Sequence, residues 1–188
     1  MTSTGLRQVS DRLWEMPERL GIFAGEMLTR GKAYFRAFPV VSERDERDLR
    51  FPTYFLLAHS VELVLKSYLV AKGTPKKALG KKPLGHDVRA IYSECERNGL
   101  AVAHQLMRPL ANRLTEINSD LTEINSDYDL RYPSGYILSI PSPSECVPPS
   151  EALIATVSAV VDPRAVAAQL QFAADTRHIQ GSKVRWSD

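Results

Sequence analysis

The apolar residues of this chain recur mainly at steps of three and four, the spacing that places side chains on one face of an α-helix. The first stripe predicts a helix that begins near Pro17 and is stopped by Pro39. Its apolar members are Leu20, Phe23, Ala24, Met27, Leu28, Ala33, Tyr34 and Phe38. A charged connector follows at residues 42–52, and Pro52 is suited to open the next helix.

The second predicted helix, residues 52–72, is apolar around most of its circumference and ends at Gly73. A helix of this kind is expected at the centre of a helical core. Three polar residues, His59, Glu62 and Lys66, interrupt its apolar run. The interruption argues for a buried helix of a globular domain and against a membrane span.

A loop rich in Lys, Gly and Pro, residues 73–85, leads to a third predicted helix, for which Asp87 is the expected cap. Gly99 is placed to end it. The fourth predicted helix has an unbroken alternation of three- and four-residue steps, which is typical of the seam along which helices pack. The members of this seam are Met107, Leu110, Leu114, Ile117, Leu121, Ile124 and Tyr128.

Inside that seam the seven residues 114–120 occur a second time as residues 121–127. Seven residues turn an α-helix by nearly two full turns, with a drift of only about 20°, so a second copy keeps the apolar face on the same side. Asn, Ser and Asp are poor interior helix formers. We therefore favour a duplication tolerated because of its length over a dimerisation seam that was selected.

The segment at residues 139–150 contains four prolines and predicts a loop rather than a helix or an interior strand. Ser150 is the expected cap of a fifth helix, which Asp162 and Pro163 close, and a sixth helix follows over residues 163–178. No convincing strand pattern is present. The chain therefore predicts an all-α bundle.

The expected domain organisation has three parts. They are a leader (1–17), a helical bundle (18–162), and a C-terminal helix with a flexible tail (163–188). A chain of 188 residues fits one such domain.

Charge and cysteine usage limit the function classes. The net charge of +2 does not demand a polyanionic partner, so any contact with nucleic acid has to come from a local basic patch. Cys95 and Cys146 lie far apart and show no metal-ligand spacing, which favours a reducing, cytoplasmic setting. The first 20 residues lack the apolar core of a signal peptide. We expect neither a cofactor nor a metal, since no nucleotide-binding glycine loop, zinc cluster or Ser/His/Asp arrangement is present.

A basic loop precedes the third helix and is the first candidate binding site. Its cations are Lys72, Lys76, Lys77, Lys81 and Lys82. Lysines beside a helix N-terminus can hold a polyphosphate or an RNA backbone through charge. The alternative is a solvated loop. Gly85, His86 and Asp87 follow directly, either as a ligand contact or as a helix cap.

Two further groups of polar residues are candidates. His59, Glu62 and Lys66 share one face of the second helix, where they form either the wall of a site or a structural ion pair. Arg131 belongs to an Arg-Tyr-Pro segment that either ends a helix or presents the arginine to a groove.

The order of these segments is similar to a known family. FLLAHSVELVLKSYLVAKG (55–73), a basic loop and LGHDVRAIY (84–92) resemble the HEPN domain, named for nucleotide-binding proteins of higher eukaryotes and prokaryotes. The family's middle helix has a pattern like HSxELxLKxxL, and GHDL-like residues open its next helix; here Val88 replaces the leucine. LRYP (130–133) also recurs in bacterial members of this kind.

The resemblance covers roughly residues 20–160 and implies a fold and partners. It implies a HEPN-like bundle of about five helices, here with the proline-rich loop and a short C-terminal tail, often as a homodimer. It also implies an association with RNA or nucleotides within bacterial toxin–antitoxin or defence systems. An antitoxin or a nucleotidyltransferase-like protein would be the partner there.

Many HEPN proteins are metal-independent ribonucleases that use an arginine with a polar neighbour and a histidine, separated by four to six residues. The nearest match here is Arg97, Asn98 and His104, but Gly99 predicts a turn inside it. We therefore expect an RNA- or nucleotide-associated module. The alternatives are an endoribonuclease that uses Arg97 and His104, and a protein-binding partner without nucleic-acid contact.

Overall fold

The structure is a computed structural model that describes residues 19–44, 46–82, 84–118 and 141–180, with only the backbone for residues 47, 118 and 177–180. The described residues form five α-helices and two short 3-10 helices, without a strand, so the predicted all-α class is confirmed. The helices are α2 (Leu20–Ser42), α3 (Arg50–Ala71), α4 (Val88–Arg97), α5 (Met107–Asn118) and α6 (Pro143–Gln180), with η1 (Arg47–Leu49) and η2 (Lys76–Ala78) between them.

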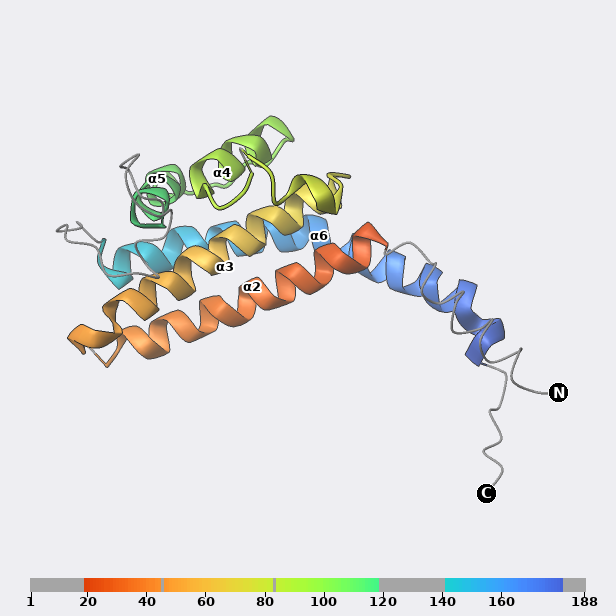
Figure 1. Cartoon of the computed structure of the whole chain (residues 1–188), viewed down its shortest axis with the longest axis horizontal. Helices are drawn as coiled ribbons and strands as arrows, with labels where there is room; N and C mark the ends of the chain where they lie inside the picture. The colour runs from red at the N-terminus through yellow and green to blue at the C-terminus, as the bar shows by residue number, and fades with distance from the viewer. Residues whose placement is uncertain (1–18, 45, 83, 119–140, 181–188) are drawn as a thin grey trace, which may run out of the picture.

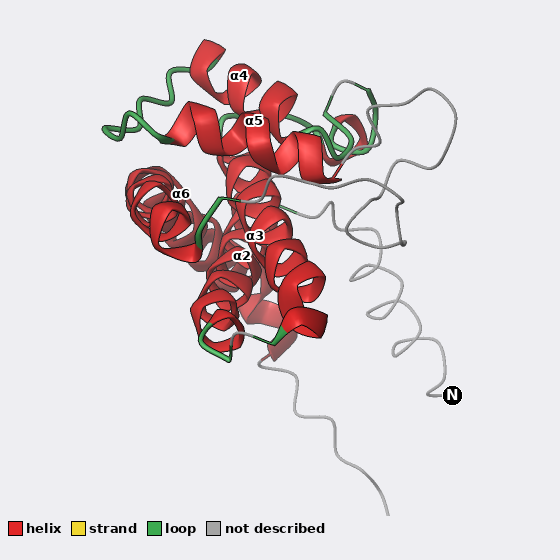
Figure 2. Ribbon diagram, turned by 90° about the vertical axis from the view of Figure 1, so that its left-hand side faces the viewer, coloured by secondary structure: helices red, strands yellow, loops and turns green. Residues whose placement is uncertain are grey.

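α3 lies at the centre of the bundle, as its composition predicts. α2 runs antiparallel beside it, and α6 packs along both, while α4 and α5 cover the remaining side of α3 (Figure 1). Figure 2, which looks roughly along the three longer helices, shows α4 and α5 as a pair on one side of them. Fifteen of the 22 residues of α3 are buried, so this helix has almost no solvent-exposed face.

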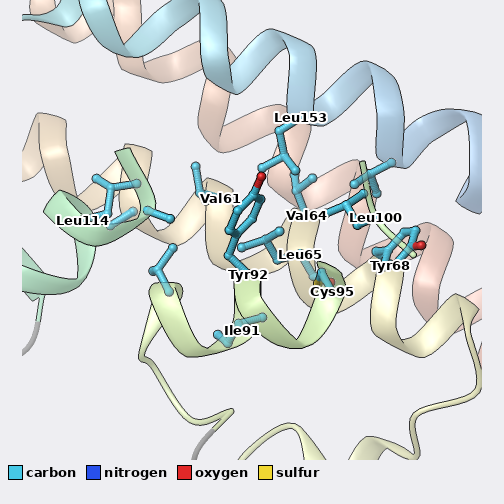
Figure 3. Packing of buried hydrophobic residues seen from close by; sticks show 14 of the residues in the cluster. Val61, Val64, Leu65, Tyr68, Ile91, Tyr92, Cys95, Leu100, Leu114 and Leu153 are labelled. Carbon is cyan, nitrogen blue, oxygen red and sulfur yellow. The ribbon is translucent and has the colours of Figure 1, made fainter. Parts of the chain in front are cut away.

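The core forms where α3 meets α4, α5 and α6 (Figure 3). The residues that α3 contributes there include Val61, Val64, Leu65 and Tyr68. They pack with Ile91, Tyr92 and Cys95 from α4, Leu114 from α5 and Leu153 from α6. Met107, Leu110, Leu114 and Ile117 are all buried, so the described half of the predicted seam is a core face.

The prolines near the α2–α3 connection do not stop these helices. α2 continues through Pro39 to Ser42, because the buried Phe38 holds this turn in the core. The Pro39 carbonyl accepts hydrogen bonds from Glu43 N at 3.0 Å and from Ser42 Oγ at 2.8 Å. α3 begins at Arg50, before Pro52. Pro52 is tolerated there because an N–H in the first turn has no helical partner.

The prediction of a proline-rich loop before the fifth helix is wrong from Pro143 onward, because α6 begins at that residue. Ser142 and Glu145 form the glutamate half of a capping box, in which Ser142 N and Ser142 Oγ donate to Glu145 Oε2 at 2.9 and 2.8 Å. Glu145 N bonds to the Ser142 carbonyl at 3.1 Å. These bonds hold the pKa of Glu145 below its usual range. The capping box was the missed sequence signal.

The later prolines lie inside α6 at positions where their missing N–H groups cost little. The carbonyls that Pro148, Pro149 and Pro163 leave unbonded belong to Ser144, Glu145 and Ala159, which are all exposed to water. The fifth and sixth predicted helices are therefore one. Ser150, the expected cap, lies inside it and donates to the Cys146 carbonyl at 2.8 Å.

The predicted ends of α3 and α4 agree with the structure. Gly73 (φ 105°) and Gly99 (φ 87°) adopt the left-handed conformation that glycine tolerates best, and each follows the C-cap residue of its helix. Asp87 caps α4, because its Oδ1 accepts from Ala90 N at 2.9 Å. The leader, the second copy of the repeat, residues 130–133 with Arg131, and the tail after residue 180 lie outside the described residues.

Candidate nucleic-acid interface

A buried ion pair on α3 anchors the loop that leads into α4. Glu62 and Lys66 are only 5% and 7% exposed, and Lys66 Nζ lies 2.7 Å from Glu62 Oε1. The same ammonium group donates to the carbonyl of Gly85. Lys66 therefore joins Gly85, two residues before the α4 cap Asp87, to the central helix.

Glu62 also holds the imidazole of His86. His86 Nδ1 lies 3.2 Å from both carboxylate oxygens of Glu62, and the His86 side chain is 46% exposed. The carboxylate thus lies between a buried ammonium and a ring that reaches the surface. The sequence presents Glu62 and His86 as parts of two separate candidates, and the structure brings them together.

Asp87 is a structural residue at this N-terminus. Besides capping Ala90 N, its Oδ1 accepts from Thr115 Oγ1 of α5 at 3.2 Å. Thr115 Oγ1 in turn accepts from Arg89 N at 2.8 Å. The capping interpretation of Asp87 is therefore confirmed, and Thr115 is a contributor that no sequence pattern indicated.

The basic loop divides into two kinds of lysine. Lys72 and Lys76 lie over aromatic rings, with Nζ 5.3 Å from the centre of Tyr68 and 4.4 Å from that of Phe23. Lys77, Lys81 and Lys82 are exposed. Within the described part of the chain, these three make no ion pair.

His59 packs among aromatic rings at the α2–α3 contact. Its ring meets Tyr34 edge-on at 4.7 Å and stacks on Phe55 at 5.7 Å. The three residues of the predicted polar stripe therefore contact two different parts of the protein. His59 packs against α2, whereas Glu62 and Lys66 bind the residues that lead into α4.

The nearest match to the nuclease pattern lies at the turn after α4, as Gly99 predicts. Arg97 is paired with Glu94 at 2.7 Å, and the Asn98 amide donates to the Glu94 carbonyl and to Glu94 Oε1, both at 2.9 Å. His104 Nδ1 accepts from Leu106 N at 3.2 Å. Each residue thus has a local structural bond, and a catalytic role for them stays a prediction.

We expect no metal-independent RNA cleavage from this turn. Wild-type protein should cleave RNA no faster than the His104→Ala and Arg97→Ala variants, assayed in the presence of a chelator. General acid–base catalysis is typically worth about 100- to 10,000-fold, so a real activity would be obvious. Cleavage by the wild type alone would establish the endoribonuclease alternative.

The cysteines do not supply a nucleophile. Cys95 and Cys146 are unpaired and buried. Burial raises the pKa of the Cys146 thiol to about 12 and raises that of Cys95 as well, so neither thiolate forms at neutral pH. Within the described ranges no group of His, Cys, Asp and Glu side chains is arranged to hold a metal ion.

A pocket of about 290 Å³ lies between α2 and α6, and none of the candidate residues above lines it. It is lined by Lys32, Phe35, Arg36, Glu151, Ile154 and Ala155.

Among the described residues, two helical stretches are long and apolar enough to cross a membrane. They are Arg50–Ala71, whose most apolar window is 78% buried in the bundle, and Pro143–Thr176, whose most apolar window is 22% buried.

No protein-family model, curated protein or solved structure matches this chain.

Proposed function

We propose that this protein is an RNA- or nucleotide-associated module of the HEPN kind, acting in the cytoplasm within a bacterial toxin–antitoxin or defence system. The observation that supports it best is the buried Glu62–Lys66 pair, which fixes Gly85 and the half-exposed His86 at the start of α4. A loop with three exposed lysines, Lys77, Lys81 and Lys82, precedes this point. Fixed polar groups beside exposed lysine side chains suit a phosphate ligand.

Side chains are the main donors that we propose for a phosphate at this surface. The N–H groups of Arg89 and Ala90 at the first turn of α4 are already taken by Thr115 and Asp87. The positive end of the α4 dipole still favours an anion nearby. The ligand would then be held by His86 and by Lys77, Lys81 and Lys82.

Such contacts bind the backbone of RNA and not its bases. Lysine ammonium groups act as point charges on phosphates, so their contribution falls steeply with salt and carries little sequence information. We therefore propose weakly sequence-selective binding of single-stranded RNA, with a nucleoside polyphosphate as the smallest ligand of the same chemistry. An antitoxin or nucleotidyltransferase-like protein is the proposed partner.

Replacing Lys77, Lys81 and Lys82 with glutamine together should weaken RNA binding and flatten its salt dependence. For single-stranded RNA, each lost phosphate contact lowers the slope of log K against log salt by about 0.7, and so three lower it by about 2. Fluorescence anisotropy with a labelled RNA oligonucleotide measures both quantities. Lys76 is left in place because its cation–π contact with Phe23 also supports the fold.

The matched control replaces Arg30, Arg44 and Arg164 with glutamine. These arginines are exposed and lie on α2, just after α2 and on α6, so the control has the same net charge as the test variant on a different surface. We expect the control to retain most of the affinity. Equal losses in the two variants would show that only net charge matters, and the proposed surface would be wrong.

A further inference from the structure

The pocket between α2 and α6 has an apolar lining that both helices supply. Phe35 belongs to α2, and Ile154 and Ala155 belong to α6, which packs along α2 here. The pocket has a volume of about 290 Å³. Pockets for drug-sized ligands measure about 300 to 1,000 Å³, so this one suits a smaller molecule with an apolar part.

Two side chains of opposite charge line the same pocket from opposite helices. Arg36 lies on α2 and Glu151 lies on α6, and both are exposed. Within the part of the chain that the structure describes, neither forms an ion pair with the other or with a third residue. The pocket therefore presents one guanidinium and one carboxylate to a ligand.

Lys32, the third charged residue of the lining, already has a counter-charge. Its Nζ lies 3.3 Å from Asp162 Oδ2 on α6. With this pair counted as neutral, Arg36 and Glu151 leave the lining with one positive and one negative charge. Such a lining is complementary to a ligand that carries one charge of each sign.

We propose that this pocket binds a free α-amino acid with an apolar side chain, such as leucine. The ligand carboxylate binds Arg36, because a planar guanidinium matches the two oxygens of a carboxylate in a bidentate pair. The ligand ammonium group binds Glu151. The ligand side chain lies against Phe35 and Ile154, in the space that the small side chain of Ala155 leaves open.

The charge balance separates this ligand from other small apolar molecules. A fatty acid or an acidic peptide side chain would bring a second carboxylate beside Glu151, and an amine would bring a second cation beside Arg36. A peptide terminus carries only one of the two charges. The site is also independent of the proposed RNA contact, since it shares no residue with that surface.

The test is a titration of the isotope-labelled full-length protein with L-leucine, followed by NMR chemical shifts. We expect saturable shifts of backbone amides around the pocket on α2 and α6. The expected Kd is on the order of 1 mM, because a ligand with so few atoms gains little free energy on binding. Shifts that do not saturate at roughly ten times that concentration would overturn the proposal.

Two leucine derivatives test the two charges separately. N-acetyl-leucine lacks the ammonium group, and leucinamide lacks the carboxylate. Each should bind about tenfold more weakly than leucine, because one hydrogen-bonded charge pair is lost. Equal affinity for N-acetyl-leucine would assign the pocket to an anion, equal affinity for leucinamide would assign it to an amine, and either result would contradict a zwitterion site.

Single variants assign each charge to its partner. Arg36→Gln should weaken leucine binding about tenfold and leave leucinamide binding unchanged, whereas Glu151→Gln should weaken leucine binding similarly and leave N-acetyl-leucine binding unchanged. Arg30→Gln and Glu26→Gln are the matched controls, since both residues are exposed on α2 and neither lines the pocket. Losses in the controls as large as those in the test variants would rule out the direct contacts.

Filling the pocket tests its apolar part without a change of charge. Ala155→Leu should abolish leucine binding, because the new side chain occupies the space of the ligand, and the fold should persist because Ala155 is exposed. Ala159→Leu makes the same change one turn along α6, at an exposed residue outside the lining, and should bind leucine like the wild type. Unchanged binding by a folded Ala155→Leu variant would show that the ligand does not occupy this pocket.

Discussion

Replacing Glu62 with leucine is expected to lower the free energy of unfolding by about 3 to 5 kcal/mol. The change leaves the ammonium group of Lys66 buried, 7% exposed, without the carboxylate that lies 2.7 Å from it. His86 loses its Glu62 contact at the same time. Urea denaturation followed by circular dichroism measures the loss.

The double variant Glu62→Leu/Lys66→Met separates this mechanism from simple loss of packing. Removing both charges takes away the buried unpaired ammonium, so most of the lost stability should return. Glu116→Leu is the control, because Glu116 pairs with Arg113 on the exposed face of α5. An exposed pair contributes about 0 to 1 kcal/mol. A double variant no more stable than Glu62→Leu would contradict this account.

The helix faces could be predicted because burial imposes a period that the sequence retains. The stripe from Met107 to Ile117 is buried, and α3 is central, because a helix without a polar face has nowhere else to lie. The glycines at positions 73 and 99 end their helices for a purely local reason, a positive φ. Such features need no knowledge of distant residues.

The proline positions were predicted less well because their cost depends on exposure. Pro39, Pro148 and Pro163 each remove one helical bond, and a sequence does not say whether water can reach the carbonyl left over. In α6 these carbonyls belong to exposed residues, so the helix continues. The Ser-x-x-Glu spacing of Ser142 and Glu145 indicates a helix start, whereas the four prolines of the same segment indicate a loop.

The candidate site was predictable only in pieces. The i to i+4 spacing indicates the Glu62–Lys66 pair, but the contact of Glu62 with His86 spans 24 residues and depends on how α4 packs on α3. Thr115 joins the site from α5 for the same reason. Tertiary contacts of this kind have no local signal.

Gly31 is a further position whose role only the packed structure shows, and Gly31→Leu is expected to destabilise the protein by about 3 kcal/mol. A Cβ at this position would lie 2.8 Å from Val64 Cγ2 and 3.2 Å from the Ser60 carbonyl oxygen. Ser60 Oγ also donates to the Gly31 carbonyl at 2.8 Å. α2 and α3 would have to separate, which opens the core at its centre.

The sign of this effect is a strict test, because helix propensity acts in the opposite direction. Leucine is favoured over glycine inside a helix by about 0.8 kcal/mol, so without the α2–α3 contact the variant would be more stable than the wild type. Gly80→Leu is the control, since a Cβ there meets no atom within 4 Å. We expect its midpoint of urea denaturation to stay near that of the wild type and that of Gly31→Leu to fall. An unchanged or higher midpoint for Gly31→Leu would show that α2 and α3 do not approach each other as closely as the structure has them.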